Sequence, residues 1–110
     1  MPNIRFTPQA IADLEEIKRY ISDDLSNPCA AADLVELVFN RIRTLASLPQ
    51  TGARIRTGTP MLKVYRFIQC KNYLVFYRIE EKHVSVIRVL YARIDYLELL
   101  EPGKKDDDDG

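Results

Sequence analysis

Cations and phenols gather at the end of the last apolar stretch of the sequence, VSVIRVLYARIDYLELL (84–100). The stretch begins as a β-prone run, includes Arg88, and then presents Tyr91, Arg93 and Tyr96 within a few residues. Arginines suit an anionic partner, and a phenol can donate a proton or a hydrogen bond. The end of this segment is therefore the first candidate for a functional surface.

Charge is unevenly distributed along the chain, although the formal net charge is zero. Residues 1–36 carry three basic and seven acidic side chains, whereas residues 37–79 carry eight basic side chains and no acidic one. A concentrated basic segment is suited to an anionic partner. The alternative is that these cations neutralise the acidic N-terminal part across the fold.

The composition excludes several classes of protein. The 110 residues, 46% hydrophobic and 29% charged, are typical of one soluble globular domain, which we expect at residues 1–103. No apolar run approaches the roughly 18 residues that cross a bilayer, and no signal peptide is recognisable, so we expect a cytoplasmic protein without membrane contact. Cys29, Cys70 and His83 are too few for a disulfide framework or a zinc site, and we expect neither a metal nor a cofactor. The charged tail 104–110 is expected to be disordered, and is either native or left from expression.

The first half of the sequence has helical periodicity. Residues 3–7 are β-prone, and Thr7-Pro8 is typical of a helix start. Apolar residues then recur at three- and four-residue spacing from Ala10 to Ile21, and again in a second helix from about Cys29 to Leu48. Asn27-Pro28 separates the two, because the residue before proline disfavours helix. The pattern predicts a helical hairpin.

The second half has strand periodicity. PQTGARIRTGTP (49–60) is predicted to be a loop, and three β-prone runs follow: MLKVYRFIQ (61–69), NYLVFYRIE (72–80) and VSVIRVLYA (84–92). The linkers between these runs are short, which predicts an antiparallel meander. DYLELLEP (95–102) is read as a short C-terminal helix whose leucines either pack on the core or mark a partner groove. The expected fold is therefore α+β, in the order β-α-α-β-β-β.

The strand arginines keep a consistent phase with their apolar neighbours. Simple alternation places Arg66 on one face with Leu62, Val64 and Ile68, Arg78 with Leu74 and Phe76, and Arg88 with Val84, Val86 and Leu90. If these faces coincide, one sheet face shows a cluster of arginines in an apolar frame. The alternative is that each arginine lies at a strand end and reaches water through its long stem. Both strand faces are apolar, but the helical hairpin can cover only one of them. We therefore expect the second face of the sheet to be covered by something other than the hairpin.

The order of elements and several motifs resemble the RelE/ParE toxin superfamily of type II toxin–antitoxin modules. The resemblance covers residues 3 to about 100: LPQTG closes the second helix, YRF opens the sheet, and the last hairpin fits a pattern of the type YxVFYRV…VxVxRVLHxRRD. That pattern is met by Tyr73, Val75, Phe76, Tyr77, Arg78, Val84, Val86, Arg88, Val89, Leu90, Arg93 and Asp95. Tyr91 stands where many ParE-like members have histidine, and Ile94 replaces a common second basic residue.

The resemblance implies a growth-arresting toxin, of a kind linked to plasmid stabilization, with two alternative mechanisms. RelE-like and YoeB-like members are ribosome-dependent mRNA endonucleases, whereas ParE-like members poison DNA gyrase through protein contact. A metal-independent endonuclease would use Arg66, Arg88 and Arg93 as cations and Tyr91 as proton donor. A convincing general base is missing, because His83 falls in the turn between strands and Glu80 and Glu81 lie beside it, away from the basic set. This favours the ParE-like branch.

The resemblance also implies a partner for the basic segment. We expect a cognate acidic antitoxin, partly disordered when free, that lies over this segment and folds on binding. The residues expected to contact the antitoxin or the target, gyrase or the ribosome with mRNA, are Arg54, Arg56, Lys63, Arg66, Arg78, Arg88, Tyr91 and Arg93. A non-toxic binding module of the same fold is the remaining alternative.

Overall fold

A computed structural model describes residues 3–55, 64–92 and 100 of the chain. The expectations for Arg56, Lys63, Arg93, the tail 104–110 and most of the C-terminal helix lie outside these residues. The elements are β1 (Asn3–Phe6), α1 (Pro8–Arg19), the π-helix η1 (Tyr20–Asp24), α2 (Pro28–Ser47), the 3-10 helix η2 (Pro49–Thr51), β2 (Ala53–Arg54), β3 (Tyr65–Cys70), β4 (Tyr73–Ile79) and β5 (His83–Tyr91). The predicted α+β order is confirmed.

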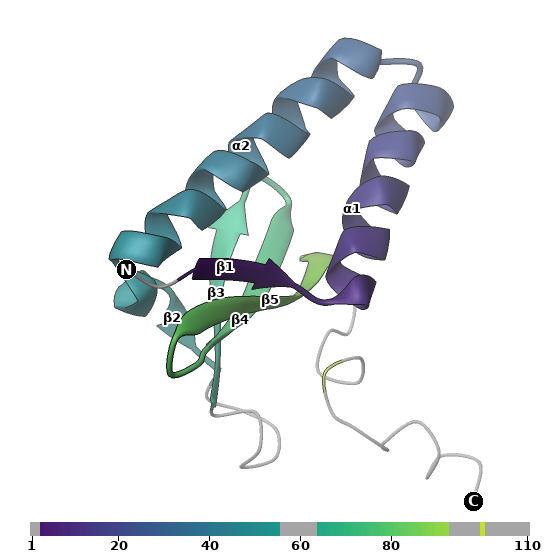
Figure 1. Cartoon of the computed structure of the whole chain (residues 1–110). Helices are drawn as coiled ribbons and strands as arrows, with labels where there is room; N and C mark the ends of the chain where they lie inside the picture. The colour runs from purple at the N-terminus through teal and green to yellow at the C-terminus, as the bar shows by residue number, and fades with distance from the viewer. Residues whose placement is uncertain (1–2, 56–63, 93–99, 101–110) are drawn as a thin grey trace, which may run out of the picture.

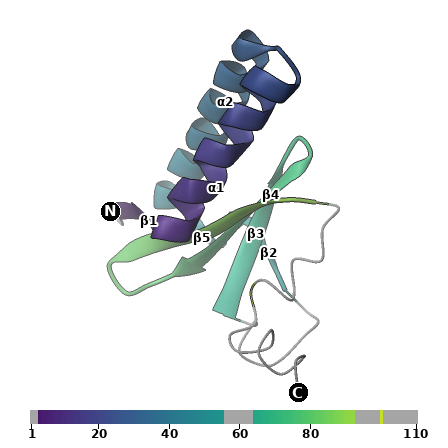
Figure 2. The ribbon, with the colours of Figure 1, turned by 90° about the vertical axis from the view of Figure 1, so that its right-hand side faces the viewer.

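The strands form one mixed sheet in the order β1-β5-β4-β3-β2. β1 pairs in parallel with β5, and the other neighbours are antiparallel, as the short turns between β3, β4 and β5 require. The α1–α2 hairpin lies on one side of this sheet, and its tip, which contains η1, projects beyond the strands (Figures 1 and 2). No helix in the described ranges is both long enough and apolar enough to cross a membrane.

Both long helices begin where the sequence predicts. The Thr7 hydroxyl accepts a hydrogen bond from the Ala10 amide at 3.1 Å and donates one to the Ile87 carbonyl at 2.7 Å, so one side chain caps α1 and fastens it to β5. The Asn27 side chain caps α2 in the same way, and Pro28 occupies its first turn. The predicted first helix changes to π-helix at Tyr20.

The segment from Pro49 onward is not wholly a loop, which corrects one prediction. It forms η2 and then the two-residue edge strand β2, and the described range ends at residue 55. Its threonines, glycines and prolines obscured this, because a strand of two residues has no periodicity to detect.

Apolar side chains are buried on both faces of the sheet, as the strand composition predicts. Between the helices and the sheet lies a core that includes Leu14, Val38, Ile42, Val75 and Val86. A second cluster occupies the opposite face. It includes Ile55, Leu74, Phe76, Leu90 and Leu100. Ile55 and Leu100 show that the chain itself contributes to the cover of the second face.

A β-bulge in β5 overturns the predicted arrangement of the strand arginines. Phe76 pairs with Arg88, but the next residue, Tyr77, pairs with Val86, so Ile87 is extra. The bulge reverses the alternation, and Arg88 therefore shares the outer face with Leu90 but not with Val84 and Val86, which are buried under the helices.

Pairing also separates the arginines of β3 and β4. Arg66 pairs with Tyr77, whose side chain lies in the helix-side core, whereas Arg78 is in phase with Phe76 on the outer face. The expected single cluster of three arginines does not form.

Candidate functional site

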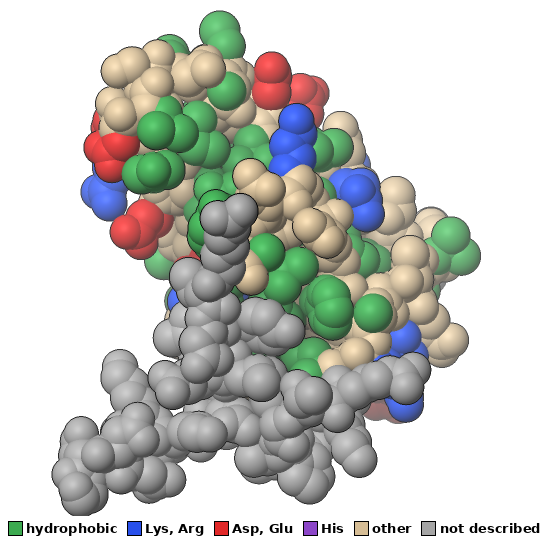
Figure 3. All heavy atoms as spheres, turned by 180° about the vertical axis from the view of Figure 1, so that it is seen from behind, with side chains coloured by type: hydrophobic (Ala, Val, Ile, Leu, Met, Phe, Trp, Pro, Cys, Tyr) green, Lys and Arg blue, Asp and Glu red, His purple; other side chains and the backbone are tan. Residues whose placement is uncertain are grey.

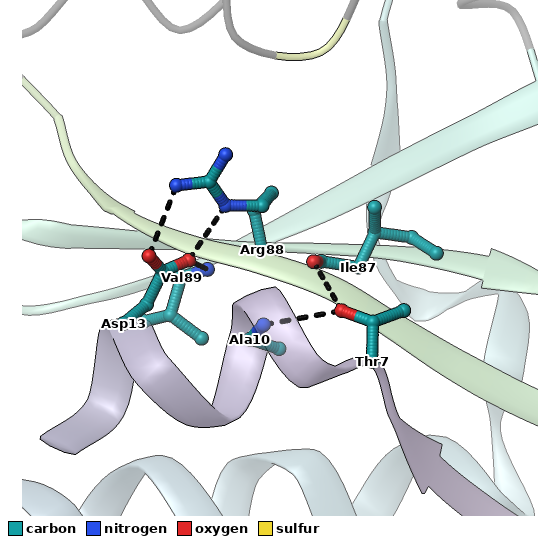
Figure 4. A network of polar contacts seen from close by, with 6 residues as sticks. All are labelled: Thr7, Ala10, Asp13, Ile87, Arg88 and Val89. Atoms are coloured by element: carbon teal, nitrogen blue, oxygen red, sulfur yellow. Dashed lines mark hydrogen bonds and ion pairs between the residues drawn. The ribbon is translucent and has the colours of Figure 1, made fainter.

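Arg88 is held by a carboxylate of helix α1. Its Nε donates to Asp13 Oδ2 at 2.8 Å and its NH2 to Asp13 Oδ1 at 3.0 Å, while the Val89 amide donates to the same Oδ2 at 3.0 Å (Figure 4). Asp13 therefore provides the acceptor for that amide. Asp13 thus joins α1 to the irregular part of β5 through three hydrogen bonds.

Burial makes this ion pair more than a surface contact. The Arg88 and Asp13 side chains are only 22% and 13% exposed. The hydrogen bond to Asp13 raises the pKa of Arg88 above its already high ordinary value, although burial opposes it. The guanidinium therefore stays charged and is already neutralised by a protein partner.

Arg66 braces the turn that follows α2. Its NH1 donates to the Gly52 carbonyl at 2.9 Å and, at 3.4 Å, to that of Gln50. The buried Tyr77 hydroxyl holds the same turn, because it accepts from the Gly52 amide at 2.8 Å and donates to the Pro49 carbonyl at 2.7 Å. These contacts give the LPQTG motif a structural role.

Tyr77 and Gly52 depend on each other sterically and electrostatically. A Cβ added at Gly52 would lie 2.5 Å from the Tyr77 hydroxyl, so only glycine allows this approach. Burial raises the pKa of Tyr77 above its ordinary value, while the hydrogen bond from Gly52 and the Arg66 guanidinium lower it.

Arg78 and Arg54 lie nearer to solvent. Arg78 forms a 3.0 Å ion pair with Glu80, with side-chain exposures of 45% and 29%. Glu80 thus neutralises Arg78, which is not one of the cations expected to act in cleavage. Arg54 is exposed on the edge strand β2 and has no salt bridge within the described part of the chain. His83 opens β5 and does not lie in the turn, because its backbone pairs with Asn3.

Tyr91 ends β5 at the lip of a groove between the helical hairpin and the sheet. The groove has a volume of about 930 Å³. Ile17, Leu34 and Val89 contribute apolar walls, and three tyrosines, Tyr20, Tyr73 and Tyr91, line it as well. The rings of Tyr73 and Tyr91 are in contact, with centroids 5.6 Å apart. Burial raises the pKa of Tyr73, and the neighbouring phenols of Tyr91 and Tyr20 raise it further.

The structure brings together only some of the predicted residues. Arg88 and Tyr91 line the same groove, whereas Arg66 braces the turn at Gly52 and Arg78 pairs with Glu80. The sequence reasoning missed Asp13, Tyr20 and Tyr73 as site residues. A weak signal existed for Asp13, which immediately precedes the apolar Leu14, but its partner lies 75 residues further on.

In the described ranges, no group of three or more histidine, cysteine, aspartate or glutamate side chains is arranged to hold a metal ion. The groove is lined by aromatic and apolar side chains and by charged side chains of both signs. Such a surface suits contact with another macromolecule.

The fold is that of toxins from type II toxin–antitoxin modules. One similar solved structure is the chromosomal ParDE system from P. aeruginosa, with 20% identity, a TM-score of 0.71 and coverage of 84% of this chain and 98% of that chain. Another is the RelBE2 toxin–antitoxin complex from Mycobacterium tuberculosis, with 25% identity, a TM-score of 0.56 and coverage of 83% of this chain and 99% of that chain. The DinJ–YafQ toxin–antitoxin complex from E. coli is similar as well, with 11% identity, a TM-score of 0.59 and coverage of 91% of this chain and 98% of that chain.

The family follows from the sequence itself. The family model described as the ParE toxin of the type II toxin–antitoxin system parDE matches residues 4–96. The chain therefore belongs to the ParE toxin family, and it is the toxin component of such a module. Among proteins of curated function, no sequence matches this chain significantly.

Proposed function

We propose that this toxin arrests growth by binding a protein target, DNA gyrase, as ParE-like members do. The supporting observation is the state of the arginines in β3, β4 and β5. Arg66 is engaged by backbone carbonyls, Arg78 by Glu80 and Arg88 by Asp13. A nuclease that neutralises a phosphorane needs cations aimed at the substrate, and these three are committed to the protein.

The same observation weakens the catalytic roles of Arg66 and Arg88. A general base beside Tyr91 would also be needed, and Asp13, one of the carboxylates that line the groove, is occupied by Arg88 and the Val89 amide. Contact with a protein requires no such base. The geometry therefore favours recognition over RNA cleavage.

An RNA endonuclease is the second candidate because of Tyr91. Its side chain is exposed at the end of β5, beside a groove, as a proton donor would have to be. On this alternative Tyr91→Phe removes the donor and lowers toxicity on the order of 100- to 10,000-fold. On the gyrase proposal the variant keeps its ring and loses at most a few-fold.

A cognate antitoxin is the proposed silencing partner. Arg41, Arg43 and Arg54 are exposed and have no salt bridge in the described part of the chain, and Arg43 donates a hydrogen bond to the neutral Asn40 side chain, so the three charges remain available to an acidic segment. The similar ParDE, RelBE2 and DinJ–YafQ structures are toxin–antitoxin systems, which supports a partner of this kind.

Separate measurement of DNA and protein synthesis tests the target. The toxin is induced in bacteria, and thymidine and methionine incorporation are followed over the first minutes. Gyrase inhibition predicts that DNA synthesis and the DNA-damage response change first, with translation still running. Rapid loss of translation with cut messages on ribosomes, and replication intact at first, would overturn the proposal in favour of the endonuclease.

A further inference from the structure

The groove between the hairpin tip and the sheet is rich in tyrosines and carboxylates, in contrast to the basic segment 37–79. Tyr20, Tyr73 and Tyr91 bring three phenol rings to it from η1, β4 and β5. Tyr20 and Tyr91 keep 49% and 38% of their surface exposed, so ring surface is available to a ligand. Neighbouring aromatic faces present negative charge density, which attracts ammonium and guanidinium groups.

Carboxylates around the groove have the matching charge. Asp13 and Arg88 neutralise each other, which leaves Glu16 and Asp33 on the helical side against Lys71 on the sheet side. Neither Glu16 nor Asp33 forms a salt bridge within the described ranges. Figure 3 shows hydrophobic side chains exposed on the helical part of the molecule, with acidic and basic side chains beside them.

The two lips of the groove are held in strained backbone conformations. Ser26, at the hairpin tip beside Leu25 and Asn27, has φ 51°, and Lys71, in the turn between β3 and β4, has φ 54°. Positive φ at residues other than glycine persists only where the surrounding structure imposes it.

We propose that this groove binds a segment of a protein partner that carries a lysine or arginine flanked by apolar residues. The cationic head lies against Tyr20, Tyr73 and Tyr91 near Glu16 and Asp33, and the flanking apolar side chains lie on Ile17, Leu34 and Val89. The inference deepens the proposed function, because it names the chemistry of one contact. The segment proposed to bind this groove is basic, whereas the segment proposed to lie over Arg41, Arg43 and Arg54 is acidic.

A blocked leucine-arginine-leucine tripeptide is the probe for this site, and the same peptide with neutral citrulline is its matched control. Titration of the purified full chain is followed through the NMR signals of the tyrosine rings. We expect saturable shifts confined to Tyr20, Tyr73 and Tyr91, and binding of the citrulline peptide weaker by roughly 5- to 30-fold.

Two variants separate the aromatic contribution from simple hydrophobic contact. Tyr20→Leu keeps apolar area but loses the ring, and it should weaken binding of the arginine peptide by roughly 5- to 30-fold. Tyr20→Phe keeps the ring, and its affinity for that peptide should stay within about threefold of wild type. Phe39→Leu, at an exposed aromatic outside this groove, should change nothing. Equal binding of the two peptides, shifts elsewhere, or no saturable shift would overturn the inference. Because neither gyrase nor ribosomes are present, this failure is distinct from a failure of the proposed target.

Discussion

Replacing Asp13 with alanine tests whether Arg88 serves the fold or acts on a target. The substitution removes the acceptor of three hydrogen bonds, two from the Arg88 guanidinium and one from the Val89 amide at the bulge. It leaves a largely buried cation and a backbone amide without their partner. The helix α1 should then hold β5 less firmly.

The expected magnitude follows from burial. Removing one partner of a fully buried pair costs about 3–5 kcal/mol. Here the two side chains keep 22% and 13% exposure, so water compensates in part, and we expect a loss of about 2–4 kcal/mol in the free energy of unfolding. Arg88→Ala should lower the free energy of unfolding somewhat less, because Asp13 still accepts the hydrogen bond from the Val89 amide.

Urea denaturation of Asp13→Ala, Arg88→Ala and the double variant measures this directly. We expect the urea midpoint of Asp13→Ala to fall by about 1–2 M. The losses in the free energy of unfolding of the two single variants should sum to about 1–3 kcal/mol more than the loss of the double variant. Arg78→Ala is the control, since its exposed pair with Glu80 should contribute at most about 0.5 kcal/mol. Losses that add independently, or a folded Arg88→Ala that is non-toxic while an equally folded Asp13→Ala is fully toxic, would refute the structural role.

The remaining predictions concern the turn after α2, the titratable core and the groove. Tyr77→Phe should destabilise the fold by about 1–3 kcal/mol in urea denaturation, because the Gly52 amide loses its acceptor; wild-type stability would contradict the bond. Gly52→Ala should cost at least about 2 kcal/mol, because its methyl group meets the Tyr77 hydroxyl; a melt unchanged from wild type would be inconsistent with that approach. Stability should fall as the pH rises from 9 through 11, because burial raises the pKa values of Cys70, Tyr73 and Tyr77 and the unfolded chain releases these protons first. Their contribution is complete below the ordinary pKa values, so a profile that is flat to pH 11 would count against it. Tyr91→Phe should leave growth arrest within a few-fold of wild type, and a hundredfold loss in a folded variant would point to proton transfer.

The helices and strands were predictable because local signals agree with the global fold. Thr7-Pro8 and Asn27-Pro28 mark helix starts by a capping side chain and a fixed φ, and both act within one turn. The change of apolar period from helical to alternating marks the sheet in the same local way. The family could be recognised for this reason, since its motifs lie along whole elements.

The candidate site was less predictable because its contacts are not local. Alternation assigned Arg88 to the face of Val84 and Val86, and one extra residue at the bulge, Ile87, reversed that assignment. The partner of Arg88, Asp13, sits on a helix whose charged residues all look solvated in a sequence pattern. Tyr77 likewise reaches a turn 25 residues away in sequence. Pairings of this range depend on the register, which periodicity does not encode.

The most direct test of the proposed mechanism is a supercoiling assay with purified DNA gyrase, relaxed plasmid and this toxin, in the absence of ribosomes. The proposed function predicts that the folded toxin inhibits supercoiling in proportion to its concentration, and that Tyr91→Phe does so equally well. Unimpaired gyrase at toxin concentrations that cleave mRNA on purified ribosomes would contradict it.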